Sequence, residues 1–310
     1  VNYTSTFEVK NVKRTGTVIL SFIFSSLSTS FGQPESQQVK LTASDAEAVG
    51  SDIDGEAASD YSGWSVSLDS DGDRVAIGAY ANDGTANDAG HVRIYEYSGG
   101  SWSQLGSDID GEAADDQSGW SVSLDKDGDR VAIGAYGNDG TANDGTSNDA
   151  GHVRIYEYSG GSWSQLGSDI DGERATDHSG QSVSLDSDGD RVAIGAPGND
   201  GTGPHMSYGS SAGHVRIYEY SGGSWSQLGS DIDGEATIDR SGRSVSMNSA
   251  GDRVAIGTGF AAASTGYVRI FKYSSGSWSQ LGSNIDGEAF TDYSGASVSM
   301  NSDGDRVAIG

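Results

Sequence analysis

The sequence contains no cysteine, three prolines in 310 residues and few basic side chains, since 18 Lys and Arg stand against 45 Asp and Glu. The absence of cysteine excludes a disulfide scaffold and any cysteine-ligated metal site. The formal net charge of −27 repels phosphate backbones, so nucleic acid is not an expected partner. The 47 glycines do not follow the three-residue period of collagen. What remains is an acidic chain punctuated by glycine, and this composition favours an all-β protein.

No apolar run in the N-terminal segment is long enough to span a membrane. The best candidate, residues 17–27, has about 11 residues, which as a helix would cover roughly half of a ~30 Å hydrocarbon core. Small residues follow this run, and basic residues precede it: Lys10, Lys13 and Arg14. This order predicts a secretory signal peptide over residues 1–32, the alternative being a buried strand. We therefore expect an extracellular protein, secreted or at the cell surface, with no membrane insertion after cleavage.

From Gly50 onward the chain is one unit repeated. The copies span residues 50–105, 106–166, 167–228, 229–281 and 282–310, and the last copy is partial. A period of this length is typical of solenoids and propellers. Residues 33–49 are expected to be a linker or a strand that closes the ring.

Each copy contains four stretches with alternating apolar and polar residues, in the first copy 64–68, 74–79, 91–97 and 102–109. Local turns join them, and four such strands make one propeller blade. The predicted fold is all-β: a β-propeller of four-stranded antiparallel blades, about four and a half in this sequence and six or seven in the full chain. We expect the apolar positions to fill the space between successive blades: Val66, Leu68, Val75, Ile77, Val92 and Ile94. Trp102 and its counterparts are expected to cover the blade edge with the indole N–H in water.

Residues 179–197 resemble the FG-GAP repeat of integrin α-type β-propellers. The segment contains Ser179-Gly, an Asp-rich loop and a strand ending in Gly-Ala-Pro197, and Gly213-His-Val matches the strand that follows in the family. The Phe of the family motif is absent in every copy. The resemblance covers residues 50–310 and implies a propeller with calcium in the first inter-strand loop.

The calcium site implied by this resemblance falls on three aspartates in each of the first three copies. Alternate carboxylates around a glycine bend supply the oxygen ligands that calcium prefers. The predicted ligands are Asp69, Asp71, Asp73, Asp125, Asp127, Asp129, Asp186, Asp188 and Asp190. The alternative is a plain hairpin turn, because Asp-Gly is a strong turn pair. The fourth copy favours the turn, since Ala250 stands where a ligand would be needed.

Variation among the copies is concentrated in two connections, between the second and third strands and between the fourth strand and the next copy. Both connections emerge on one face of a propeller, and loops on a rigid frame commonly carry binding. Neutral drift on a solvated rim is the alternative. The candidate ligand-binding residues on this face are Tyr61, Trp64, Tyr80, Trp120, Tyr136, His178, His205, Tyr208, Arg240, Arg243 and Tyr293. His91, His152 and His214 recur at one strand position and are interpreted as structural.

The abundant carboxylates recur in every copy, whereas a catalytic pair should be unique in the ring. We therefore expect no enzyme and no catalytic residue in this sequence. The predicted function is a non-catalytic binding or adhesion module whose partner is an extracellular protein or a glycan. Two alternatives remain: a propeller hydrolase or lyase with its catalytic residues outside the sequence, and a passive spacer in a larger surface protein.

Overall fold

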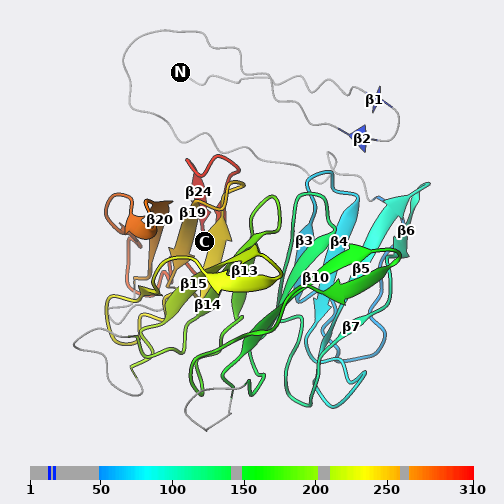
Figure 1. The fold of residues 1–310 in the computed structure, drawn as a ribbon, viewed down its shortest axis with the longest axis horizontal. Coiled ribbons are helices and arrows are strands. Elements are labelled where there is room, and N and C mark those ends of the chain that lie inside the picture. Colours follow the sequence, from blue (N-terminus) through cyan, green and yellow to red (C-terminus); the bar gives the residue numbers. More distant parts are fainter. Residues whose placement is uncertain (1–12, 15–16, 19–48, 141–148, 202–209, 259–264) are drawn as a thin grey trace, which may run out of the picture. The chain divides into compact units, whose positions relative to one another are not determined.

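The computed structural model describes residues 13–14, 17–18, 49–140, 149–201, 210–258 and 265–310 (Figure 1). The chain divides into two compact units, Val1–Val49 and Gly50–Gly310. In the first unit, β1 (Lys13–Arg14) and β2 (Thr17–Val18) form a two-stranded antiparallel ladder. The rest of the predicted signal peptide lies outside the described residues. No helix in the described part of the chain has the length and apolar character needed to cross a lipid bilayer.

The second unit is a β-propeller built from antiparallel blades, with four complete sheets and a fifth, two-stranded one. The innermost strands of successive sheets lie side by side (Figure 1). These strands are β3 (Ser65–Leu68), β8 (Ser121–Leu124), β13 (Ser182–Leu185), β18 (Ser244–Met247) and β23 (Val298–Met300). The second strands are β4 (Arg74–Ala79), β9 (Arg130–Ala135), β14 (Arg191–Ala196), β19 (Arg253–Gly257) and β24 (Val307–Ile309). The predicted fold class is thereby confirmed.

The outer half of each blade consists of one long strand and one broken strand. The long third strands are β5 (His91–Ser98), β10 (His152–Ser159), β15 (His214–Ser221) and β20 (Tyr267–Ser274). The fourth strands are split into β6 (Ser101–Gln104) and β7 (Ile109–Asp110), β11 (Ser162–Gln165) and β12 (Ile170–Asp171), β16 (Ser224–Gln227) and β17 (Ile232–Asp233), and β21 (Ser277–Gln280) and β22 (Ile285–Asp286).

The sequence predicted a single fourth strand over 102–109, and this detail was wrong. In the first blade β6 pairs with the last residues of β5, whereas β7 pairs with its first two. Between them, Leu105 N still donates to Ile94 O at 2.7 Å. The polar–apolar alternation continues through the break, so the pattern alone does not reveal where the ladder is interrupted.

Apolar side chains fill the layer between successive blades. Ala76, Val92 and Ile94 of the first blade pack with Val131 and Ile133 of the second, and each is at most 1% exposed. The next two layers repeat this composition. A single four-stranded sheet cannot bury both faces, so each blade gains its buried surface from its neighbours.

The first blade departs from the predicted packing. Val66 and Leu68 of β3 are 63% and 59% exposed, whereas their counterparts Val183 and Leu185 are 8% and 6% exposed. These positions face the preceding blade, and none precedes the first one among the described residues. The prediction that Val66 and Leu68 lie between blades was therefore wrong for this copy.

Serines of the innermost strands link each blade to the next through hydrogen bonds. Ser65 Oγ donates to Gly119 O at 2.7 Å, and Ser67 Oγ accepts from Leu124 N at 2.9 Å. The same pair of bonds recurs between the later blades. The serines of the Ser-Val-Ser-Leu strand thus face the following blade, and the apolar residues face the preceding one.

Candidate functional site

The two variable connections lie side by side and form what we call the loop face. Isolated parallel bridges join the end of each second-to-third strand connection to the connection that enters the next blade, as between Gly90 and Ser118. The same bridge recurs at three further blade boundaries. Residues from consecutive copies are therefore brought together on this face.

Six aromatic rings from three copies form a continuous row on the loop face, which we call the aromatic row. Its members are Tyr61, Trp64, Tyr80, Trp120, Tyr136 and His178. The ring-centroid distances are 5.1 Å for Tyr61–Tyr80, 5.1 Å for Trp64–Tyr80, 4.8 Å for Trp64–Trp120, 4.9 Å for Tyr80–Trp120, 4.4 Å for Trp120–Tyr136 and 5.6 Å for Tyr136–His178. Trp64 is 51% exposed and Tyr61 is 56% exposed, so the row presents ring surface to solvent.

The connection that enters each blade holds its variable residue in a left-handed backbone conformation. The φ angles are 55° at Tyr61, 58° at Gln117, 55° at His178, 53° at Arg240 and 53° at Tyr293. This region is costly for residues other than glycine, and such conformations cluster at functional sites. The side chain at this position varies among the copies while its backbone geometry does not.

A buried aspartate before the left-handed residue fixes the connection. Asp177, 2% exposed, accepts hydrogen bonds from the backbone N–H groups of Glu173 at 3.2 Å and Arg174 at 3.0 Å. Its Oδ2 also accepts from Asn199 Nδ2 at 2.9 Å, which ties it to the neighbouring connection. The backbone of His178, the next residue, is thus held from both variable connections.

His178 ends the aromatic row, and the charges of Asp149 and Arg240 act on its imidazole. Partial burial lowers the pKa of His178 below its ordinary value of 6.5, and the positive charge of Arg240 lowers it further, against the opposing effect of Asp149. The imidazole is therefore neutral near pH 7. Its ring contacts Tyr136 edge-on, with an interplanar angle of 80°. A neutral imidazole beside an exposed aromatic surface is suited to accept a proton from a bound water.

The remaining predicted ligand-binding residues fall into two groups. Arg240, Arg243 and Tyr293 lie on the same face, in the connections that enter the fourth and fifth sheets, and Arg243 N donates to Arg240 O at 3.2 Å. His205 and Tyr208 lie outside the described residues. Six of the eleven predicted ligand-binding residues therefore contact one another, in the aromatic row.

The predicted calcium loops form tight turns in which the first side chain binds its own loop. Asp125 Oδ1 accepts hydrogen bonds from the N–H groups of Asp129 and Arg130, both at 3.0 Å. In the fourth copy Asn248 makes the same two bonds, and its Nδ2 donates to Asp252 Oδ1 at 2.8 Å. Arg74 of the first blade also donates to the Asp127 and Gly128 carbonyls. These contacts are those of the hairpin turn that was the alternative interpretation.

Each of the three loops contains a carboxyl group with a raised pKa: Asp73 in the first, Asp125 in the second and Asp186 in the third. Burial, and next the nearby Asp129, raise the pKa of Asp125 to about 6, and the backbone N–H bonds oppose the shift. The pKa of Asp186 is raised to about 6 by the same causes, with Asp190 as the neighbouring carboxylate. Asp125 and Asp186 therefore keep their protons to a higher pH than an exposed aspartate does.

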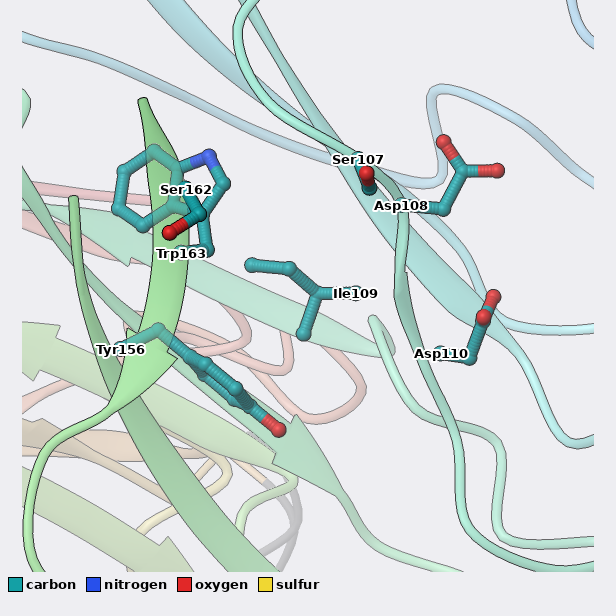
Figure 2. Close-up of a pocket in the computed structure, with 7 residues that line it drawn as sticks. All are labelled: Ser107, Asp108, Ile109, Asp110, Tyr156, Ser162 and Trp163. Atoms are coloured by element: carbon teal, nitrogen blue, oxygen red, sulfur yellow. The ribbon is translucent and has the colours of Figure 1, made fainter. Parts of the chain in front are cut away.

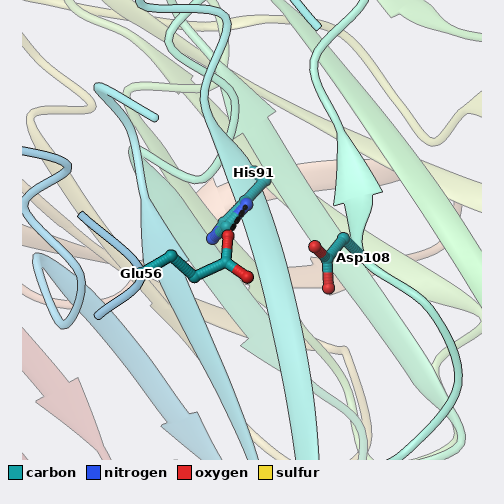
Figure 3. Close-up of side chains that lie close together, drawn as sticks. All are labelled: Glu56, His91 and Asp108. Atoms are coloured by element: carbon teal, nitrogen blue, oxygen red, sulfur yellow. Dashed lines mark ion pairs between the residues drawn. The ribbon is translucent and has the colours of Figure 1, made fainter. Parts of the chain in front are cut away.

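Sequence reasoning overlooked a second recurring constellation of possible metal ligands. Glu56, His91 and Asp108 bring ligand atoms within 4.8 Å of one another (Figure 3). Equivalent sets occur in the next two blades: Glu112, His152 and Asp169, and Glu173, His214 and Asp231. The recurring histidines were interpreted as structural, but Nε2 of His152 and of His214 has no hydrogen-bond partner. Carboxylate and histidine groups that could hold a metal are thus present.

Hollows between neighbouring blades lie at the outer strands. The first, of about 220 Å³, is lined by Ser107, Asp108, Ile109, Asp110, Tyr156, Ser162 and Trp163 (Figure 2). The carboxylates of Asp108 and Asp110 point away from the Trp163 ring (Figure 2). These two carboxylates are therefore not directed at the aromatic wall of the hollow, and the aromatic row is the stronger candidate site.

The blades and the loop face define a β-propeller of four-stranded antiparallel sheets. No known protein family and no curated protein matches the sequence. Solved structures do match. One is a Bacteroides uniformis protein to which 6-phosphogluconolactonase activity has been attributed, with a TM-score of 0.52, 14% identity, and coverage of 80% of this chain and 63% of that one.

Two further matches are similar in extent. A periplasmic gluconolactonase from Pseudomonas aeruginosa gives a TM-score of 0.52 at 14% identity, covering 79% of this chain and 64% of that one. A Lactobacillus plantarum protein gives 0.50 at 15% identity, covering 79% and 62%. At such identities the likeness shows a common fold, and the chain spans less than two thirds of each matched structure.

These comparisons correct three predictions. The matched propellers include lactonases, and none of those described above is an integrin-type FG-GAP protein. The resemblance to FG-GAP repeats is therefore wrong. The Asp-Gly turn between two strands, on which it rested, is a general hairpin signal and does not define one family. The matches also overturn the expectation of a non-catalytic adhesion module and of no enzyme. They favour the alternative of a propeller hydrolase.

Proposed function

We propose that the protein is a propeller hydrolase that opens the ring of sugar-acid lactones at the loop face. The proposal is supported by the fold shared with the two lactonase structures. The observation that carries it is the position of His178, a neutral and partly buried imidazole at the end of a solvent-facing aromatic row. His178 has no histidine counterpart at the equivalent position of the other copies.

The aromatic row suits the substrate class. A lactone of a sugar acid presents a flat carbonyl region and an apolar C–H face, which pack well against exposed indole and phenol rings. The net charge of −27 repels phosphorylated ligands. We therefore expect neutral lactones to be better substrates than their phosphate esters.

His178 and Arg240 supply the chemistry. His178 accepts a proton from water as the water oxygen attacks the lactone carbonyl carbon. The tetrahedral intermediate then expels the ring oxygen, which takes that proton from the imidazolium, and a hydroxy acid results. Arg240 lies close enough for its charge to lower the pKa of His178, and the same charge stabilises the developing oxyanion and the product carboxylate.

The test is hydrolysis of gluconolactone and 6-phosphogluconolactone by the purified chain. A pH-stat measures the acid that is released, and the spontaneous rate is subtracted. His178→Gln is the decisive variant, because glutamine occupies the equivalent position as Gln117 and the fold tolerates it there. We expect a loss of kcat of at least about 100-fold. Tyr61→Gln, the matched change in the first copy, should retain kcat. A wild-type chain without activity above background on either lactone would refute the proposal.

For the aspartate loops we propose calcium as the cation, because they offer only oxygen donors. The favouring observation is the carboxylate of Asp129 beside Asp125, whose negative charge helps burial to raise the pKa of Asp125 and would be balanced by a divalent cation. Calcium should then raise the melting temperature relative to excess EGTA, and Asp125→Asn with Asp186→Asn should reduce that rise. An unchanged melting temperature would refute calcium binding.

Secretion is also part of the proposal. It is supported by the predicted signal peptide and by a matched structure that is periplasmic. Of the predicted partners, the proposal retains the carbohydrate class, as a small sugar-derived substrate.

A further inference from the structure

The Glu–His–Asp sets of the first three blades lie outside the aromatic row, and each has the same construction. The histidine opens the third strand and is at most 2% exposed, the glutamate comes from the connection entering the blade, and the aspartate comes from the break in the fourth strand. In the first blade His91 Nδ1 lies 3.8 Å from Glu56 Oε2 (Figure 3). A buried nitrogen donor thus lies beneath two solvent-accessible carboxylates.

Each carboxylate uses one oxygen for a neighbouring side chain. Glu56 Oε1 lies 3.6 Å from Arg93 Nη1, and Asp108 Oδ1 accepts a hydrogen bond from Gln104 Nε2 at 2.5 Å. These contacts orient the carboxylates while the Glu56 Oε2 atom remains directed at His91. The same arginine and glutamine contacts recur in the second and third blades.

The three imidazoles are buried donors, since His91, His152 and His214 are at most 2% exposed. The tautomer of a neutral imidazole is set by the hydrogen bond made at its other nitrogen. Nε2 of His152 and His214 is buried and has no hydrogen-bond partner, so no bond at that atom fixes the tautomer of either ring.

The fourth blade provides an internal comparison. There Tyr267 replaces the histidine and Asn284 replaces the aspartate, while Glu235 is retained. Asn284 Nδ2 donates to Glu235 Oε2 at 2.8 Å, and the Tyr267 hydroxyl donates to Asp239 at 2.6 Å. The nitrogen donor and one carboxylate are lost together, and a direct amide–carboxylate hydrogen bond bridges the two remaining side chains. In the other three blades two like charges face each other without such a bond.

We propose that each of the first three blades binds one divalent cation of the zinc type through this Glu–His–Asp set. One imidazole nitrogen and two carboxylate oxygens, with water as a fourth ligand, are a donor set that zinc accepts. Ligand atoms around tetrahedral zinc lie about 3.3 Å apart. The observed 3.8 Å between His91 and Glu56 needs only a small rotation of an exposed carboxylate.

The experiment is zinc binding to the tag-free chain by equilibrium dialysis against ZnCl2, with excess CaCl2 present to saturate all-oxygen sites. We expect three zinc ions per chain. The variant Asp108→Asn/Asp169→Asn/Asp231→Asn reproduces the residue found naturally as Asn284, so it should fold. It should bind zinc at least about 100-fold more weakly.

A second test introduces a zinc site into the fourth blade. Tyr267→His with Asn284→Asp should raise the stoichiometry from three to four, whereas Asn284→Asp alone should leave it at three. Circular dichroism checks that each variant retains the wild-type fold. The proposal is overturned if the wild-type chain binds no zinc, or if its bound zinc survives the three aspartate substitutions.

Discussion

Trp163 of the second blade donates its indole N–H to the carbonyl oxygen of Leu105 in the first blade at 2.7 Å. The same bond joins Trp225 to Leu166 and Trp278 to Leu228. The sequence predicted an indole N–H exposed to water, and that prediction was wrong. The accepting carbonyl lies at the break of the neighbouring blade's outer strand, so this bond links the two blades at their outer rim.

Replacing Trp163 with Phe should therefore lower the free energy of unfolding by about 1 to 2 kcal/mol, since it removes one hydrogen bond and part of the ring packing. Urea unfolding measures the change. Ser162→Ala is the matched control, because Ser162 is exposed and adjacent, and it should change stability by less than about 0.5 kcal/mol. Equal stability of Trp163→Phe and wild type would show that the indole N–H bond contributes nothing.

Asp125 and Asp186 should make stability depend on pH. Their folded-state pKa values of about 6 lie above the unfolded value of 3.8. Their contribution to stability is therefore fully present below pH 3.8 and is lost as the pH rises through about 6. An asparagine at the same position donates to the last aspartate of the loop at every pH, as Asn248 does to Asp252.

The variant Asp125→Asn/Asp186→Asn should thus be more stable than wild type at pH 7.5, by up to about 6 kcal/mol for the two groups together. At pH 4 the two proteins should unfold at nearly the same urea concentration. Both measurements are made in EDTA to exclude bound cations. A gain of the same size at both pH values would contradict the raised pKa values.

Much of the fold could be predicted because the repeat is local. Alternation and turn residues placed strands such as 74–79 correctly, since the pairings inside a blade join segments that are close together in the chain. Features that depend on the neighbouring blade were missed. The Trp163 hydrogen bond and the exposure of Val66 both depend on whether a blade precedes their own. The residue pattern within one copy carries no information about its neighbours.

The candidate site was partly predictable for a related reason. Equivalent positions in successive copies, such as Trp64 and Trp120, must lie next to each other in a propeller, so comparing copies grouped the aromatic residues. Their ring contacts depend on side-chain rotamers and could not be read from the sequence. The expectation of no enzyme rested on the lack of a unique carboxylate pair, and it left out a single imidazole such as that of His178, which has no histidine counterpart in the other copies.

Trp120 should contribute most to substrate binding among the aromatic residues. Its ring contacts Trp64, Tyr80 and Tyr136 at 4.4 to 4.9 Å, so it lies at the centre of the row. Trp120→Ala should raise KM for the lactone about tenfold, equivalent to about 1.4 kcal/mol, and change kcat little. Tyr293→Ala, on the same face but outside the row, should leave KM unchanged. Equal effects of the two substitutions would mean that the row is not the binding surface.

The pH dependence of lactone hydrolysis should report the ionisation of His178. A general base must be deprotonated, so kcat/KM should fall as the pH decreases through a pKa below 6.5, the direction that burial and Arg240 impose. Removing the positive charge in Arg240→Gln should move this acid limb to higher pH. Arg243→Gln is the matched control, because Arg243 is not among the causes of the shift at His178.

The profile is measured between pH 5 and 7.5 with the spontaneous rate subtracted at each point. The limb should be unmoved in Arg243→Gln and absent from the residual activity of His178→Gln. A limb that keeps its position in Arg240→Gln and persists in His178→Gln would assign the ionisation to another group. In that case His178 would serve the aromatic row only as a packing residue, and the base would have to be found elsewhere on the loop face.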